Sequence, residues 1–193
     1  IPIGIFSYIC VVKAAQTRKH ILEKAAPVFN RKGYDGTSLA DLEEAKGLTK
    51  GALYGNFPDK HALAGEVFGY TTALVKQRLR QVLEPVPTFK GKLVALLEVF
   101  AAYVLHPPVD GGCPLLNTAV EADDHRTEMK PLVAREIREV VHFIALLLKK
   151  GVKAGEFRKD IDVRELSYTF FCCIEGAIMF SRVEGSRQPM NIV

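Results

Sequence analysis

The residues whose types and spacing could do chemistry lie mainly between Thr37 and Lys60. Ser38 can cap the start of a short helix, and Asp41, three residues on, can return a bond to the backbone N–H of Ser38. Gly47 suits a left-handed turn because it has no Cβ. Thr49 can then cap a second short helix. The spacing therefore predicts two short helices joined by a tight glycine turn.

The second of these helices has an apolar and a polar face. Leu53 and Phe57 lie four residues apart, so they share one face and are expected in the core. The residues that remain outward are small, polar or cationic: Lys50, Gly51, Ala52, Tyr54, Gly55 and Asn56. A helix surface of this composition can enter the major groove of DNA. The alternative for Tyr54 is a half-buried tyrosine of the core.

The remaining polar residues do not form the pattern of a catalytic or metal site. The sequence has no Ser/His/Asp order, no phosphate-binding glycine loop and no metal-ligand spacing, and its five histidines form no i,i+4 pair. An acidic cluster over residues 121–125 can bind a metal, although a solvated helix end would have the same composition. We therefore expect neither an enzyme nor a cofactor.

The composition is that of a globular protein with a locally basic segment. The chain has 193 residues, 48% of them hydrophobic and 25% charged, which suits one domain or a small head with a larger body. Its net charge is +4, and residues 13–60 hold nine Lys/Arg against six Asp/Glu, a difference of +3. This excess favours contact with phosphates, although a solvated helix face would carry the same charge.

The cysteines and the apolar N-terminal residues indicate in which cellular compartment the protein is expected. The four cysteines, Cys10, Cys113, Cys172 and Cys173, form no CxxC pair, so a reducing cytoplasm is the simplest environment. Residues 1–12 are apolar but too few to span a bilayer, and they lack the basic start of a signal peptide. We therefore expect a cytoplasmic protein without a membrane partner.

Helical spacing extends along the chain, and the alternating pattern of strands is absent. Helices are expected over residues 17–32, 59–83, 89–105, 115–122, 127–153 and 163–183, in addition to the two short ones. The sequence thus predicts an all-α fold. Its expected parts are an N-terminal arm (1–16), a three-helix helix-turn-helix head (17–63) and a C-terminal body of about five helices (64–193).

The segment 17–63 resembles the DNA-binding domain of the TetR (tetracycline-repressor-like) family of transcriptional regulators. The resemblance covers about 47 residues, and their order and spacing make it specific. The matching residues are Ile21, Leu22, Ala25, Ala26, Phe29, Gly33, Tyr34, Thr37, Ser38, Leu42, Gly47, Thr49, Lys50, Gly51, Leu53, Tyr54, Phe57, Lys60 and Leu63. The chain departs from the family pattern at Gly55, where an aromatic or basic residue is common, and at Asn56, where His is common.

The resemblance and the residue types agree on how DNA would be held. Lys50 is expected to reach a phosphate or a guanine edge, and the Tyr54 hydroxyl a phosphate. Thr37 and Thr49, at helix N-termini, can donate to phosphates beside free backbone N–H groups. Lys60, at the start of the following helix, is expected at a flanking phosphate.

The other residues of the second short helix allow close approach. Gly51 and Gly55 leave room for the DNA, Ala52 can contact a thymine methyl, and Asn56 can read adenine or contact the backbone. One head buries too little surface for specific binding at cellular salt. Two heads on a palindrome, ~34–36 Å apart, would supply enough contacts, which predicts a homodimer on double-stranded DNA.

Two apolar stripes in the C-terminal body suit a dimer interface. The first consists of Val133, Ile137, Val140, Val141, Ile144, Leu147 and Leu148; the second consists of Leu166, Phe170, Ile174, Ala177, Ile178 and Ser181. A four-helix bundle across a twofold axis would join them. The expected interface residues are Ile137, Val141, Ile144, Leu148, Phe170, Ile174 and Ile178. The alternative is that both stripes fill the core of one chain.

The resemblance implies that the body senses a small molecule and that the protein represses transcription. A hydrophobic or aromatic effector would release DNA by binding the DNA-free form more tightly. The residues that can line its cavity are Phe68, Phe100, Tyr103, Cys113, Leu116, Asn117, Glu121, Phe143 and Phe170. Each is also compatible with ordinary core packing. Two alternatives are a repressor that senses oxidants or electrophiles through Cys113 and a helical interaction protein without DNA binding.

Overall fold

The computed structural model describes residues 3–45 and 47–193, and the side chains of residues 12–45 and 47–193. All regular elements of this part are helices, which confirms the all-α prediction. The head contains α1 (Ile3–Lys32), α2 (Leu39–Glu44) and α3 (Lys50–Asn56). The body contains α4 (Lys60–Leu83), α5 (Phe89–Tyr103), α6 (Pro114–Asp124), the 3-10 helix η1 (Thr127–Met129), α7 (Lys130–Lys153), α8 (Val163–Glu184) and α9 (Gln188–Ile192).

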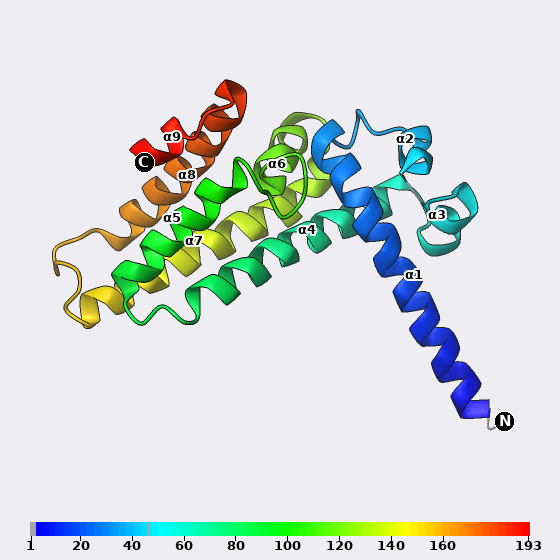
Figure 1. The fold of residues 1–193 in the computed structure, drawn as a ribbon, viewed down its shortest axis with the longest axis horizontal. Helices are drawn as coiled ribbons and strands as arrows, with labels where there is room; N and C mark the ends of the chain where they lie inside the picture. The colour runs from blue at the N-terminus through cyan, green and yellow to red at the C-terminus, as the bar shows by residue number, and fades with distance from the viewer. Residues whose placement is uncertain (1–2, 46) are drawn as a thin grey trace.

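Helix α1 includes most of the expected arm. Residues 3–16 continue the same helix as residues 17–32, whereas residues 1–2 of that arm lie outside the described residues. In Figure 1 the first turns of α1 extend away from the rest of the head. From Val12 on, where the side chains are described, α1 is exposed as far as Thr17 and its first buried residue is Ile21.

The head has a small core of its own. Its helices meet around Ile21, Phe29, Leu42, Leu53 and Phe57, each at most 8% exposed. The prediction that Leu53 and Phe57 face inward is therefore confirmed. Burying side chains of this size contributes roughly 1.5–3 kcal/mol each, which holds short helices that would not be stable alone.

Helix α4 connects the two cores. Its first turns place Leu63 and Val67 in the head core, and Phe68, Leu79 and Leu83 lie in the body core. Figure 1 shows α4 running from the head along one side of the body. A movement of α4 against the body must therefore move the head as well.

The body is a helical bundle with α7 and α8 packed against each other. Its core is centred on Leu96, Tyr103, Ile144, Ile174 and Ile178, all at most 2% exposed. Among the described residues, α8 is the one helix long and apolar enough to cross a membrane, and only 28% of its most apolar window is buried within the chain. A helix that forms an interface with another protein chain is also long, apolar and incompletely buried within its own chain.

Candidate nucleic-acid interface

The turn between α2 and α3 follows the predicted chemistry. Ser38 Oγ accepts from the Asp41 N–H at 3.1 Å while Asp41 Oδ2 accepts from the Ser38 N–H at 2.7 Å, which completes the capping box. The Lys32 ammonium, with these bonds, holds the pKa of the Asp41 carboxyl well below its usual range. Gly47 has φ +92°, as expected for the turn.

Helix α3 is capped from two directions at its N-terminus. Thr49 Oγ1 accepts from the Ala52 N–H at 3.1 Å, as predicted, and Glu43 Oε1 accepts from the Lys50 N–H at 3.0 Å. Sequence reasoning missed Glu43, because the contact depends on how the turn folds back. A phosphate near this end must therefore approach beside a carboxylate, while the Thr49 hydroxyl hydrogen remains available.

The outward face of α3 is open to a partner. Lys50, Gly51, Tyr54 and Gly55 are exposed, with Tyr54 at 47%. A Cβ built on Gly51 or Gly55 meets nothing within 4 Å. Nothing in the described chain therefore requires glycine at these positions, although glycine in a helix costs roughly 0.5–1 kcal/mol relative to alanine. The exposure of Tyr54 also argues against its assignment to the core.

Arg18, which the sequence analysis did not single out, holds the C-terminus of α3. Its Nη1 donates to the Asn56 carbonyl oxygen, and its guanidinium lies 4.2 Å from the centroid of the Phe57 ring. Its Nε also donates to Glu66 on α4 at 3.0 Å. The Asn56 amide nitrogen donates to the Ala52 carbonyl at 2.9 Å, so this side chain turns back onto its own helix.

Two expected DNA contacts are engaged inside the protein. Thr37 is 1% exposed and its hydroxyl donates to the Gly33 carbonyl at 2.6 Å, so its assignment as a phosphate contact is wrong in this structure. The hydroxyl completes the turn after α1, and Ser38 caps α2 in its place. Lys60 Nζ lies 4.3 Å from the centroid of the Tyr34 ring, and burial lowers the pKa of its ammonium. Lys60 must leave this ring to reach a phosphate.

The end of α1 is held by α6. Glu121 accepts from the backbone N–H groups of Tyr34 at 2.7 Å and Asp35 at 3.2 Å. Asn117 Nδ2 donates to the Asn30 carbonyl at 2.9 Å, where α1 is about to end. Asn117 and Glu121 were expected in an effector cavity, but their polar groups join the head to the body.

The crevice beside this junction is small. It lies between α1, α4 and α6 and has a volume of about 40 Å³, and its lining includes Phe68, Asn117 and Glu121. A water needs about 10–15 Å³ on this measure, whereas ligand pockets measure about 300–1,000 Å³. The crevice therefore suits a few waters rather than an effector.

The other residues expected around an effector are spread over different places. Phe100 and Tyr103 lie in the body core with ring centroids 5.5 Å apart, and Leu116 and Phe170 pack against the same core. Phe143 instead lines a groove of about 570 Å³ between α4, α5 and α7. The sequence could not separate these positions, because aromatic residues on inward and groove-facing stripes have the same spacing.

Cys113 lies in a buried polar cluster. It is 6% exposed, and its thiol donates to Glu175 Oε1 at 3.2 Å. Burial raises the pKa of the Glu175 carboxyl to about 7, and burial together with this carboxyl raises the pKa of the Cys113 thiol. The Tyr103 hydroxyl and Glu175 Oε2 have no hydrogen-bond partner among the described residues. A buried, protonated thiol is a poor nucleophile, which disfavours Cys113 as an electrophile sensor.

Most of the expected dimer residues belong to the core of one chain. Val141, Ile144, Leu148, Ile174 and Ile178 are at most 7% exposed. The half-buried Ile137 and Phe170 pack against the same core. The stripes were correctly predicted as apolar. The assignment of the five buried residues to an interface is wrong, because they pack within one chain, whereas that of the half-buried Ile137 and Phe170 stays a prediction. The apolar side chains that α8 leaves exposed are Leu166, Tyr168, Met179, Phe180 and Val183.

No group of three or more His, Cys, Asp or Glu side chains is placed to hold a metal within the described ranges.

A family model described as bacterial regulatory proteins of the tetR family matches residues 21–67. A second, described as the C-terminal domain of tetracyclin repressor-like proteins, matches residues 90–193. Together they cover α2, α3, most of the packed part of α1, the start of α4, and the chain from residue 90 to its end.

Solved structures and curated relatives agree with these models. A TetR transcriptional regulator from Chloroflexus aurantiacus J-10-FL is 35% identical, with a TM-score of 0.88 over 93% of this chain and 90% of that one. A TetR-family regulator from Cytophaga hutchinsonii is 38% identical, with a TM-score of 0.85 over the same shares. The HTH-type transcriptional repressor DhaR from Mycobacterium sp. (strain GP1) is 25% identical over 90% of this chain and 86% of its own length.

Gly51 allows the folding and DNA-binding roles of α3 to be separated. Because a Cβ there meets no protein atom, Gly51→Ala should stabilise the protein by up to about 1 kcal/mol while weakening DNA binding about tenfold through a clash with the duplex. Thermal unfolding and binding to sheared genomic DNA in dilute buffer measure the two effects. Gly65→Ala on α4, where a Cβ also meets nothing within 4 Å, is the matched control. Unchanged DNA affinity in Gly51→Ala would contradict close approach at this residue.

The buried Glu175 predicts a pH dependence of stability. Its folded pKa of about 7 lies above the ordinary value of 4.5, so the folded state holds this proton more tightly. The associated stability is present below about pH 4.5 and is lost as the pH rises towards and through 7. Glu175→Gln should therefore stabilise the protein more at pH 8 than at pH 5, measured by urea unfolding. The exposed Glu184→Gln on the same helix should show no such difference, and equal effects of Glu175→Gln at both pH values would refute the assignment.

Proposed function

The chain belongs to the TetR family of DNA-binding transcriptional regulators, and we propose that it is a cytoplasmic homodimeric repressor. In this proposal it binds a palindromic operator and is released by a small hydrophobic or aromatic effector. The family's members are regulators and not enzymes. The observation that carries the proposal is the outward face of α3. Lys50, Gly51, Tyr54 and Gly55 are exposed there, and a Cβ on either glycine would meet nothing within 4 Å.

Contact with DNA is supported by the different roles of the inward and outward faces of α3. Its inward residues, Leu53 and Phe57, fix the helix to the head, while Lys50 and Tyr54 project from the other side. An ammonium at the helix start and a phenolic hydroxyl one turn later are groups that contact phosphates and guanine edges. Glycine beside each of them leaves the backbone accessible. A purely structural helix gains nothing from this composition.

The homodimer is supported by the exposed apolar face of α8. Phe180 is 56% and Val183 84% exposed, and Met179 and Leu166 lie on the same helix with at least 40% exposure. Several exposed apolar side chains on one helix indicate an interface. Pairing of α8 with its twofold copy would cover this stripe and set the spacing of two heads. It would also account for the apolar composition of α8 without a membrane.

The link between effector and DNA is supported by α4 and by the junction of α1 with α6. Helix α4 contributes to both cores, so a ligand that shifts it within the body changes the position of α3. Glu121 and Asn117 attach the end of α1 to α6 by four hydrogen bonds. An effector that binds one arrangement of these helices more tightly would change DNA affinity by that difference.

Genomic selection tests DNA binding. Sheared DNA from the organism is captured on the full-length protein at low salt and sequenced, and the enriched fragments should contain half-sites about one helical turn apart. The double variant Lys50→Ala/Tyr54→Ala should lose about tenfold or more in affinity for them, with an unchanged unfolding temperature. Lys159→Ala, an exposed lysine of the body, is the matched control. Absence of enriched fragments, or wild-type affinity in the double variant, would refute DNA recognition by this face.

Sedimentation tests the dimer interface. Phe180→Glu places a charge in the exposed stripe of α8 and should convert the dimer to monomers at micromolar concentration, because burying an unpaired carboxylate is costly. Val120→Glu on α6, a position that is also exposed at 68%, should remain dimeric. A monomeric wild type, or a Phe180→Glu variant that sediments as a dimer, would exclude this interface.

A further inference from the structure

The groove between α4, α5 and α7 has the size and lining of a ligand site. Its volume is about 570 Å³, within the usual range for small-molecule pockets. Leu79, Leu83 and Leu96 form a buried apolar floor, and Phe143 and Leu146, each 38% exposed, stand at its edge. A ligand that covers these apolar side chains removes them from water, which is favourable in free energy.

The rim of the groove is basic. Arg80, Lys92 and Lys150 line it, and the ion pairs within 4.0 Å found in the described part of the chain include none of these three. Glu84 is the one lining carboxylate that is also outside these pairs. Three cations against one carboxylate leave an excess of positive charge beside the apolar floor, which complements an anion.

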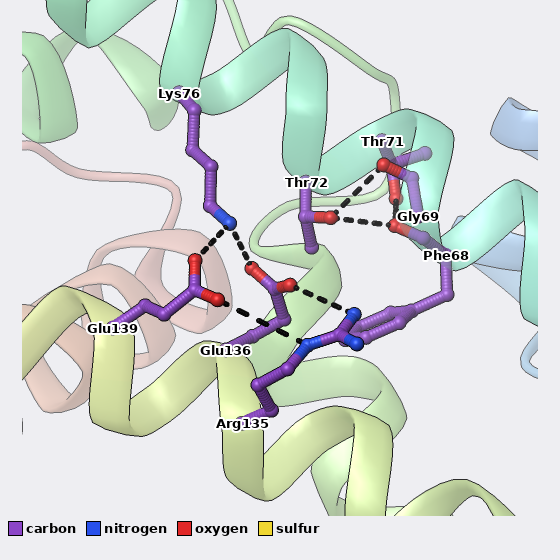
Figure 2. A network of polar contacts seen from close by, with 8 residues as sticks. All are labelled: Phe68, Gly69, Thr71, Thr72, Lys76, Arg135, Glu136 and Glu139. Carbon is purple, nitrogen blue, oxygen red and sulfur yellow. Dashed lines mark hydrogen bonds and ion pairs between the residues drawn. The ribbon is translucent and has the colours of Figure 1, made fainter.

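The remaining two charges of the lining hold α4 against α7. Figure 2 shows Lys76 of α4 between Glu136 and Glu139 of α7, with Nζ–O distances of 2.6 Å to each. Glu136 is 5% exposed, so this pair is partly removed from water, where it is less screened. Arg135 contacts both carboxylates from the solvent side. Lys76 and Glu139 line the groove as well as forming this attachment.

We propose that this groove binds an amphipathic carboxylate, a molecule with an apolar body and one anionic end. The body covers Leu79 and Phe143, and the carboxylate is held by Arg80 and Lys150. An anion there also competes with Glu139 for Lys76, which weakens the attachment of α4 to α7. This last step deepens the effector release proposed above and rests on it, whereas the binding site does not.

Next to this attachment, two threonines of α4 bond to the backbone of their own helix. The hydroxyls of Thr71 and Thr72 donate to the Phe68 carbonyl at 2.9 and 3.0 Å, and Thr72 also reaches the Gly69 carbonyl at 3.0 Å (Figure 2). Side-chain bonds of this kind compete with the helix ladder and bend helices. A Cβ on Gly69 would meet nothing within 4 Å. Release of Lys76 thus acts one turn away from this segment.

The test measures binding of decanoate to the full-length protein by calorimetry, without DNA and below the micelle concentration. Decylammonium, which has the same chain and the opposite charge, is the matched ligand. Decanoate should bind at least tenfold more tightly. The double variant Arg80→Gln/Lys150→Gln should lose this preference, whereas Lys153→Gln, on α7 but outside the groove lining, should keep it. Arg80→Lys should retain most of the affinity, and unfolding temperatures confirm that the variants fold.

Equal binding of the two ligands, or wild-type decanoate affinity in the double variant, would overturn the site. The step to DNA is tested separately by adding decanoate to the protein bound to its selected fragments. The α4 mechanism predicts that Lys76→Met, which lacks this attachment, binds the fragments more weakly without ligand and responds less to decanoate than the wild type. Wild-type affinity and wild-type release in this variant would contradict the mechanism. Decanoate bound in the groove without any change in DNA affinity would refute that mechanism alone. A protein that binds decanoate but no genomic fragment would contradict the proposed function and not the site.

Discussion

The orientation of the head on the body depends on the hydrogen bonds that α6 makes with the backbone groups at the end of α1. A helix leaves its last carbonyl groups without partners inside the helix. Here the Asn30 carbonyl accepts from Asn117, and the N–H groups that follow the helix donate to Glu121. These partners come from the body, and they add to the bond that the Gly33 N–H donates to the Phe29 carbonyl within the head. The head is therefore held at a fixed angle by polar bonds of α6, in addition to its attachment through α4.

The same junction links α6 to the interior of the body. The loop before α6 approaches α1 so closely that a Cβ on Gly111, where φ is +116°, would lie 2.6 Å from backbone atoms of Asn30. Two residues later Cys113 precedes the first turn of α6 and its thiol bonds to Glu175 of α8. A continuous set of contacts thus connects α8, through the loop, to the end of α1. Helix α4 provides a second connection, on the side of the groove.

How much of this could be predicted depended on whether a feature is local in sequence. The capping box at Ser38 and the turn at Gly47 were predicted correctly because both depend on residues within a few positions. Arg18 and Glu175 were missed, since their roles arise from partners 38 to 62 residues away. The buried residues of the two apolar stripes were wrongly assigned to a dimer interface for a related reason. Apolar spacing identifies an inward face, but Ile144 and Phe180 can be assigned to core and surface only when the neighbouring helices are in place.

Helix α3 is held in place by contacts from other helices, so its outward side chains are not needed to stabilise it. Helix α3 has seven residues, two of them glycine, and a helix of this length is unstable by itself. Its ends are held by Glu43 and Arg18, which lie on other helices. Its inward side is fixed by buried apolar residues. Since none of this support involves the outward side chains, those can change without loss of the fold. The departure from the family pattern at Gly55 therefore does not prevent the head from folding, and we expect its effect to lie in which DNA is bound.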